Sequence, residues 1–363
     1  MMKAFIYLFV LGQFLFSCSK KQIIETDKLS LYDSVSISID YPLLSQYVKL
    51  VPYCIDNSVY ATGYNFYEHS IDFIDLTGGN NFILSLQREG PNGVLPVQDY
   101  CFVADKIVCK DESGILTLSM DGSVIERLSI KELVSPAEKY SVRPRGGSLS
   151  DYQYLNSWND KVFVSLSPVM KDDFVHIGKI YDVSKHLLEF LPPCYPSEVV
   201  DFAQYLGSLS IPDINMHSAD KIVYNFPFSS QVYLYDVGTA ETKILDVRSQ
   251  MIDNELDFEE WKGMDLVDKA QKEISLSRFG RVYYSSSLDK YYRIHYGKEN
   301  VDGGMPRNIY LMVFDESGSS IKEYLLPKQF TSQYFFLHDT LFFACRSNND
   351  MSFKIAKISL DIL

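Results

Sequence analysis

The sequence predicts an all-β fold, a six-bladed β-propeller of four-stranded antiparallel blades, and three observations support it. A short hairpin unit recurs six times along the 363 residues. Strand-like stretches follow each unit, so that a repeat holds about four strands in about 40–60 residues, which is typical of propeller blades. A spare strand near the start and a missing strand at the end predict that both ends of the chain share one blade.

The first segment of the chain is typical of an export signal. Lys3 supplies a positive charge, and Ala4–Leu15 is an uncharged run that is shorter than the roughly 20 apolar residues needed to cross a bilayer. The run ends in Leu-Phe-Ser before Cys18, which resembles the lipobox of bacterial lipoproteins. We therefore predict that residues 1–17 are a signal peptide, cut before Cys18, and that this cysteine carries lipid. An ordinary secretory signal with an incidental cysteine is the alternative.

Residues 18–33 are predicted to be a tether between the lipid and the folded domain. The first mature residues after Cys18 read Ser-Lys-Lys-Gln. They lack an aspartate at the second mature position, which would resemble an inner-membrane retention signal. They also lack an acidic cluster, which would resemble the surface-export signal of Bacteroides-type lipoproteins. We therefore expect an outer-membrane lipoprotein that faces the periplasm.

Residues 34–363 are predicted to form a single propeller domain. Its first strand, Val35–Ile39, alternates in polarity as an edge strand does. Each hairpin unit then consists of Asp or Asn, a small residue or Lys, and an apolar run, which is typical of a strand, a tight turn and a second strand. The units begin 48, 55, 60, 69 and 50 residues apart, at Asn57, Asp105, Asp160, Asp220, Asp289 and Asp339. Six unrelated hairpins in a β-sandwich are the alternative.

A third and a fourth strand follow most hairpins. The second unit shows them as Ile115–Met120 and Ser123–Leu128, separated by Asp-Gly. The last unit has only Phe353–Leu360 after its hairpin, so its fourth strand is missing. We expect Val35–Ile39 to supply this strand and to hold the ring shut, because the pairing removes an open sheet edge.

Two stretches near the fourth hairpin are predicted to be helical insertions. They are Pro196–Leu206 and Asp253–Ile274, and the second carries apolar residues at helical spacing. One interpretation is a cap packed on the rim of the propeller, and the other is a lid over its central opening.

The stretch from Gln87 to Val94, QREGPNGV, resembles a Gly-rich loop between blades one and two of six-bladed propeller lipoproteins from Bacteroides-type bacteria. Asn92 and Val94 depart from that pattern. Tyr291–Ile294 (YYRI) likewise resembles a strand of a family in that group, within the TolB-like six-bladed superfamily. The resemblance implies the propeller fold over most of the mature chain. It implies no single activity, because that superfamily includes binding proteins, scaffolds, peptidase-associated propellers and lactonase-like enzymes.

The net charge of the chain restricts the classes of molecule that it can bind. The formal net charge is −13, and loss of Lys3 with the signal peptide makes it −14. Such an acidic surface repels phosphate backbones, so we expect no nucleic-acid partner. We expect a monomer that the lipid on Cys18 holds to the membrane.

Cys101 and Cys109 lie in apolar runs and are expected to be buried free thiols.

Sequence motifs for catalysis or cofactor binding are absent. There is no GxSxG elbow, HExxH, P-loop, GxGxxG or EF-hand loop. We therefore predict no cofactor, with a divalent cation in the central channel as the alternative.

Polar residues are expected to ring the channel where each inner strand begins. The arginines among them favour an anionic ligand, because guanidinium binds carboxylates and phosphates bidentately. Alternatively, each arginine pairs with an acidic neighbour between blades. Arg293 and His295 share a strand face with Tyr291, and this face either lines a pocket or holds Tyr291 in the core with the other two solvated. The candidate ligand-binding residues are Arg88, Glu89, Arg143, Arg145, Asp213, Arg278, Arg293, His295 and Arg346.

These observations favour a non-enzymatic module of the cell envelope that binds a partner protein or a small, anionic ligand. The alternative is a metal-assisted hydrolase or lyase with its site in the central channel. A structural scaffold in an envelope complex is a third hypothesis.

Overall fold

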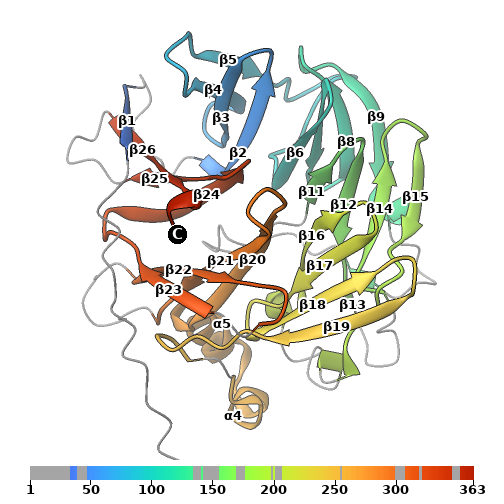
Figure 1. Cartoon of the computed structure of the whole chain (residues 1–363). Helices are drawn as coiled ribbons and strands as arrows, with labels where there is room; N and C mark the ends of the chain where they lie inside the picture. Colours follow the sequence, from blue (N-terminus) through green and yellow to red (C-terminus); the bar gives the residue numbers. More distant parts are fainter. Residues whose placement is uncertain are drawn as a thin grey trace, which may run out of the picture.

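The structure is a computed structural model, and it describes residues 33–38, 47–133, 140–141, 155–168, 176–197, 199–200, 207–253, 256–298, 307–318, 321–345 and 352–363. Six four-stranded antiparallel sheets are set around a common centre (Figure 1). The six-bladed propeller predicted from the sequence is confirmed.

Each blade begins with its inner strand, since the first strands of neighbouring blades contact one another. Blades one to three consist of β2 (Tyr47–Ile55), β3 (Ser58–Asn65), β4 (Ser70–Asp75) and β5 (Phe82–Ser85); β6 (Asp99–Val103), β7 (Lys106–Lys110), β8 (Gly114–Ser119) and β9 (Val124–Ser129); and β11 (Leu155–Trp158), β12 (Lys161–Ser165), β14 (Gly178–Asp182) and β15 (Leu187–Phe190).

Blades four to six follow the same plan. They consist of β16 (Asp213–Ser218), β17 (Lys221–Asn225), β18 (Gln231–Asp236) and β19 (Glu241–Asp246); β20 (Arg278–Ser285), β21 (Lys290–Tyr296), β22 (Ile309–Phe314) and β23 (Ile321–Leu325); and β24 (Phe330–Leu337), β25 (Thr340–Cys345), β26 (Ser352–Ser359) and β1 (Asp33–Ser38).

A few short elements lie outside the blades. They are α2 (Ile130–Leu133), the two-stranded sheet of β10 (Tyr140–Ser141) and β13 (Ser167–Pro168), the 3-10 helices η3 (Gly207–Ser210) and η4 (Leu360–Ile362), and the helices α4 (Phe258–Gly263) and α5 (Leu266–Ser275). Within the described ranges, no helix has the length and apolar character needed to cross a membrane.

All six predicted hairpins are present as the first and second strands of the blades. Four of their two-residue turns begin at a positive φ, which the favoured two-residue hairpin turns have. These turn residues are Asp56 at 51°, Ala104 at 51°, Asn159 at 53° and His338 at 49°. The six hairpin turns share one face of the ring, here called the turn face. The connections from one blade to the next lie on the opposite face, here called the connection face.

The two ends of the chain close the ring as predicted. Strand β1 pairs antiparallel with β26, from Asp33 opposite Lys357 to Ser38 opposite Ser352. Because Ser359 of β26 lies opposite Thr340, beside the β24–β25 turn, the Asp33 end of β1 lies at the turn face. The strand covers residues 33–38, slightly earlier than the predicted Val35–Ile39.

The hydrophobic core is divided among the joints between blades. Six clusters of buried side chains each combine residues of two neighbouring blades. In the joint that closes the ring, Leu50 and Ala61 of blade one pack with Phe335 and Ile355 of blade six. The ring is therefore held by apolar packing at every joint, which explains why the strands carry so many apolar residues.

The predicted helical stretch Asp253–Ile274 is confirmed, but it forms two helices. The first ends at Gly263, and Asp265 caps the second by accepting hydrogen bonds from the N–H groups of Val267 and Asp268. Trp261 of α4 is 2% exposed and packs with Leu209, in agreement with a cap (Figure 1). In the other predicted stretch, residues 197, 199 and 200 are helical, and residues 201–206 lie outside the described residues.

Candidate functional site

Polar side chains of the inner strands meet near the centre of the ring. In β2, β20 and β24 the strand pairing is interrupted by β-bulges, between Tyr47 and Leu50, Phe279 and Val282, and Phe330 and Tyr334. A bulge changes the direction of a side chain in an otherwise regular strand. These three bulges contain Lys49, Arg281 and Gln333.

Lys49 and Asp99 form a buried ion pair that joins blades one and two. Their side chains are 4% and 0% exposed. Asp99 also accepts hydrogen bonds from the N–H groups of Tyr100 and Leu155, both at 2.8 Å, so it ties blade three to the pair. Burial lowers the pKa of Lys49, Asp99 opposes this shift, and the charge of Arg281 adds to it.

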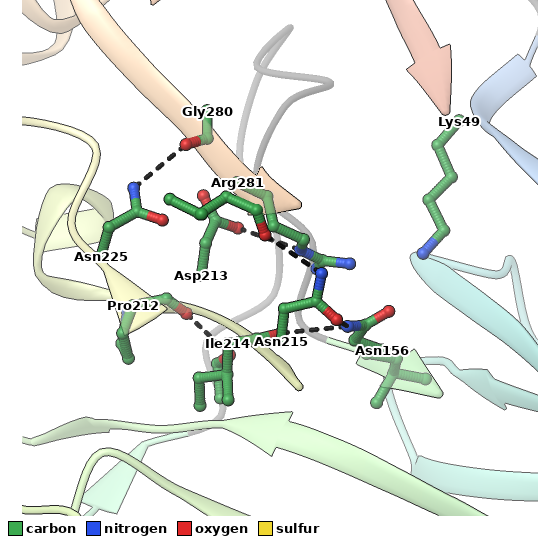
Figure 2. Close-up of polar contacts among 12 residues, drawn as sticks. Lys49, Asn156, Pro212, Asp213, Ile214, Asn215, Asn225, Gly280 and Arg281 are labelled. Atoms are coloured by element: carbon green, nitrogen blue, oxygen red, sulfur yellow. Dashed lines mark hydrogen bonds and ion pairs between the residues drawn. The ribbon is translucent and has the colours of Figure 1, made fainter. Parts of the chain in front are cut away.

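Amide side chains make the corresponding links at other joints (Figure 2). Asn156 of blade three donates to the carbonyl of Ile214 at 3.1 Å and to Oδ1 of Asn215 at 3.0 Å. Asn215 of blade four donates to the carbonyl of Val282 in blade five at 3.1 Å. Gln333 of blade six accepts from the N–H of Leu50 in blade one at 3.0 Å. These polar groups stabilise the ring.

Arg281 differs from these groups because its guanidinium is only loosely held. Its Nε lies 4.0 Å from Oδ1 of Asp213, and the side chain is 16% exposed. Asp213 is the one acidic partner of Arg281 among the described residues. Figure 2 shows the guanidinium extending past Asp213 toward Asn215 and Asn156. Such a group can bind a carboxylate or phosphate through two parallel hydrogen bonds.

Four of the predicted residues lie on the connection face. Arg88 and Glu89 are exposed in the β5–β6 connection, where Arg88 donates to the carbonyl of Tyr67 at 3.2 Å. Asp213 and Arg278 begin β16 and β20, as predicted, and are 3% and 6% exposed. Arg278 lies over the ring of Tyr296, 5.4 Å from its centroid. Of these four residues, Asp213 is the one that pairs with Arg281.

Arg293 and His295 share a strand face as expected, but both are 0% exposed. Tyr291 belongs to the core between blades four and five. Arg293 donates to Nε2 of His295 at 3.2 Å and to the carbonyl of Val247 in blade four at 3.0 Å. They therefore neither line an open pocket nor face solvent, and instead join blades four and five.

Glu323 completes this buried network, with its Oε1 3.4 Å from Nδ1 of His295. Burial alone would raise the pKa of Glu323, but the neighbouring His295 and the hydrogen bonds from Ser249 and the N–H of Gln250 hold it below the usual value. Burial lowers the pKa of Arg293 to about 9, against the opposing field of Glu323.

Four of the predicted residues cannot be placed. Cys18, Arg143, Arg145 and Arg346 lie outside the described residues. Their roles stay predictions.

Two further predictions concern cysteines and metals. Cys101 and Cys109 are buried free thiols, as expected. Burial raises the pKa of Cys101 to about 12. In the part of the chain that the structure describes, no three His, Cys, Asp or Glu side chains are grouped as metal ligands would be.

The residues that sequence reasoning missed are Lys49, Arg281 and the inner-strand amides. A signal for them exists, since each is a polar residue within the apolar strand that precedes a hairpin turn. Lys49 lies in the strand YVKLVPYCI, and Arg281 lies in RFGRVYYS. The bulges that direct both side chains leave no comparable mark in the sequence.

The chain is similar to a protein family and to solved structures. The model of a family described as a domain of unknown function (DUF4221) matches residues 26–324. A crystal structure of a member of that family from Bacteroides vulgatus ATCC 8482 is 12% identical, with a TM-score of 0.65, and the match covers 90% of this chain and 99% of that chain. None of the curated proteins matches the sequence.

A second similar structure is a protein of Bacteroides fragilis NCTC 9343 whose name describes it as exported. It is 11% identical, with a TM-score of 0.53, and the match covers 91% of this chain and 95% of that chain. At such identities the two structures show the fold alone. The resemblance to a Bacteroides-type propeller family is confirmed.

Proposed function

The chain belongs to the DUF4221 family, and we propose that it is a lipid-anchored, non-enzymatic propeller that binds an anionic ligand in the cell envelope. The ligand is a small carboxylate or phosphate, or an acidic segment of a partner protein. It binds from the connection face at the centre of the ring, with the guanidinium of Arg281 as its main contact.

The observation that carries this proposal is the contrast between Arg281 and its neighbours. Lys49 and Asp99 are paired and buried, and the amides of Asn156 and Asn215 bind the next blade. Among the described residues, the ionic partner of Arg281 is Asp213 at 4.0 Å, and the arginine side chain is 16% exposed. An arginine supports anion binding and does not supply a general acid or base.

The proposed anchor and the proposed site fit together geometrically. The Asp33 end of β1 lies at the turn face, so a tether from Cys18 would reach the propeller on that face. Arg281 is the fourth residue of β20 and Lys49 the third residue of β2, and both inner strands begin at the connection face. The binding face would then point away from the membrane. The exported relative agrees with an envelope location.

The test measures anion binding by the detergent-solubilised full chain with isothermal titration calorimetry, using succinate and inorganic phosphate as probes. We expect at least one probe to bind, and Arg281→Gln to raise its Kd about tenfold or more, as loss of a hydrogen bond to a charged group does. Arg281→Lys should give an intermediate Kd, because lysine keeps the charge without the bidentate geometry.

Arg248→Gln is the matched control. Arg248 is an exposed arginine that pairs with Asp246 at 2.9 Å, and its loss should leave the Kd unchanged. Equal affinities for the wild type and Arg281→Gln would contradict the proposal, as would no binding of either probe.

A further inference from the structure

A separate cavity of about 340 Å³ lies between the helical cap and blade four. Its volume is within the range of small-molecule sites, about 300–1,000 Å³. Its apolar lining is formed by Leu209, Phe228, Leu256 and Leu276. These residues belong to the hydrophobic cluster around Trp261. The packing of the cap therefore builds the apolar side of this cavity.

Among the described residues, five charged side chains line the cavity, and four of them neutralise one another in pairs. Lys298, which follows β21, forms an ion pair with Asp253 of the loop before α4. Lys272 of α5 forms an ion pair with Glu260 of α4. The two lysines are therefore already engaged, and a ligand carboxylate would have to compete with protein carboxylates for them.

The fifth of these residues, Asp257, has no such partner in the part of the chain that the structure describes. It is the N-cap of α4, where its Oδ1 accepts a hydrogen bond from the N–H of Glu260 at 2.9 Å. No lysine or arginine in the described ranges pairs with its carboxylate. The described residues of the cavity wall thus carry one surplus negative charge beside an apolar surface.

We propose that this cavity binds a small organic amine. The apolar body of the ligand packs against Phe228 and Leu276, and its ammonium group binds the carboxylate of Asp257. This site differs from the one at Arg281 in the sign of its charge and in the elements that form it, so it does not depend on the proposed function.

The test compares two ligands with the same apolar body and opposite charge. They are 2-phenylethylamine and 3-phenylpropionate, titrated into the detergent-solubilised full chain by calorimetry. We expect the amine to bind at least about tenfold more tightly than the acid, since an ammonium gains a charge-assisted hydrogen bond that the acid cannot make.

Asp257→Asn removes the charge and keeps an equally good helix cap, so the fold is preserved. It should weaken amine binding about tenfold. Glu259→Gln is the matched control, because this side chain lies on the same helix and is 82% exposed. It should leave amine binding unchanged, as should Arg281→Gln.

Three outcomes would overturn the proposal. They are no binding of the amine to the wild type, equal binding of amine and acid, and equal amine affinities of Asp257→Asn and Glu259→Gln. None of these outcomes changes the separate expectation that Arg281→Gln loses anion binding, so the two proposals can fail independently.

Discussion

His295 is held in its neutral form by the joint between blades four and five. Its Nε2 accepts a hydrogen bond from Nε of Arg293, which requires an unprotonated nitrogen. Burial lowers the pKa of His295 to about 4, Glu323 opposes this shift, and the charge of Arg293 adds to it. The unfolded chain, in which a histidine has a pKa of about 6.5, therefore binds a proton that the folded chain does not.

The stability of the protein should depend on this histidine below neutral pH. A depressed pKa in the folded state gives a contribution that is present above about pH 6.5 and is lost as the pH falls toward 4. Between pH 6.5 and 5, the free energy of unfolding should fall by about 2 kcal/mol more in the wild type than in His295→Gln. Urea unfolding at several pH values measures this difference, and identical pH slopes would count against the buried network.

Cys18 allows a direct test of the anchor. Cells that express the wild type should incorporate an alkyne-labelled palmitate into the protein, which should sediment with membranes. Cys18→Ala should lose both the label and the sedimentation, because no thiol remains to carry the lipid. Cys54→Ala, which removes an exposed thiol elsewhere, should keep both. A labelled Cys18→Ala protein would disprove the assignment.

At the scale of single residues, the sequence predicts only part of the structure. It indicates that Arg293 and His295 share a strand face, but their partners Val247 and Glu323 come from other strands and connections. The burial of this group therefore could not be predicted. Arg281 was missed for a different reason. A bulge sets the direction of its side chain, and a bulge shifts the register of the strand without changing the hydrophobic pattern of the sequence.

At the scale of elements, β1 closes the ring with six paired residues. Without it, β26 would be an open edge, which invites pairing with other chains. In a chain that starts after residue 38, the free energy of unfolding measured with urea should be lower by about 3 kcal/mol or more. This chain should also aggregate. A chain that starts at residue 33 is the matched control and should behave as the full domain does. Equal stabilities would refute the closing role of β1.

The elements themselves follow well from the sequence. An Asp or Asn beside a turn, between two apolar runs, is a local signal, and each of the six units forms a hairpin. The division of the cap into α4 and α5 was missed, although Asp265 is a residue that commonly caps a helix start. The apolar spacing continues through the break, so periodicity alone predicts one helix.

At the scale of the molecule, we propose that the ring separates membrane attachment from ligand binding. Every joint has an apolar cluster and the two chain ends share a blade, so the propeller is one body with two distinct faces. The central claim is that a lipid on Cys18 holds the turn face toward the membrane and leaves the connection face, with Arg281, open to a ligand.

Two exposed cysteines lie on opposite faces of the ring and can report its orientation. Cys54 lies at the end of β2 beside a hairpin turn, and Cys194 lies in the connection between blades three and four. Cys101, Cys109 and Cys345 are buried and should resist labelling. Among the described cysteines, Cys194→Ser therefore leaves Cys54 as the exposed thiol that a fluorescent dye can label. Likewise, Cys54→Ser leaves Cys194.

Energy transfer from each dye to acceptor lipids tests the central claim most directly, with the lipidated protein reconstituted in vesicles. The account predicts higher transfer from the dye on Cys54 than from the dye on Cys194. Equal transfer, or higher transfer from Cys194, would contradict it.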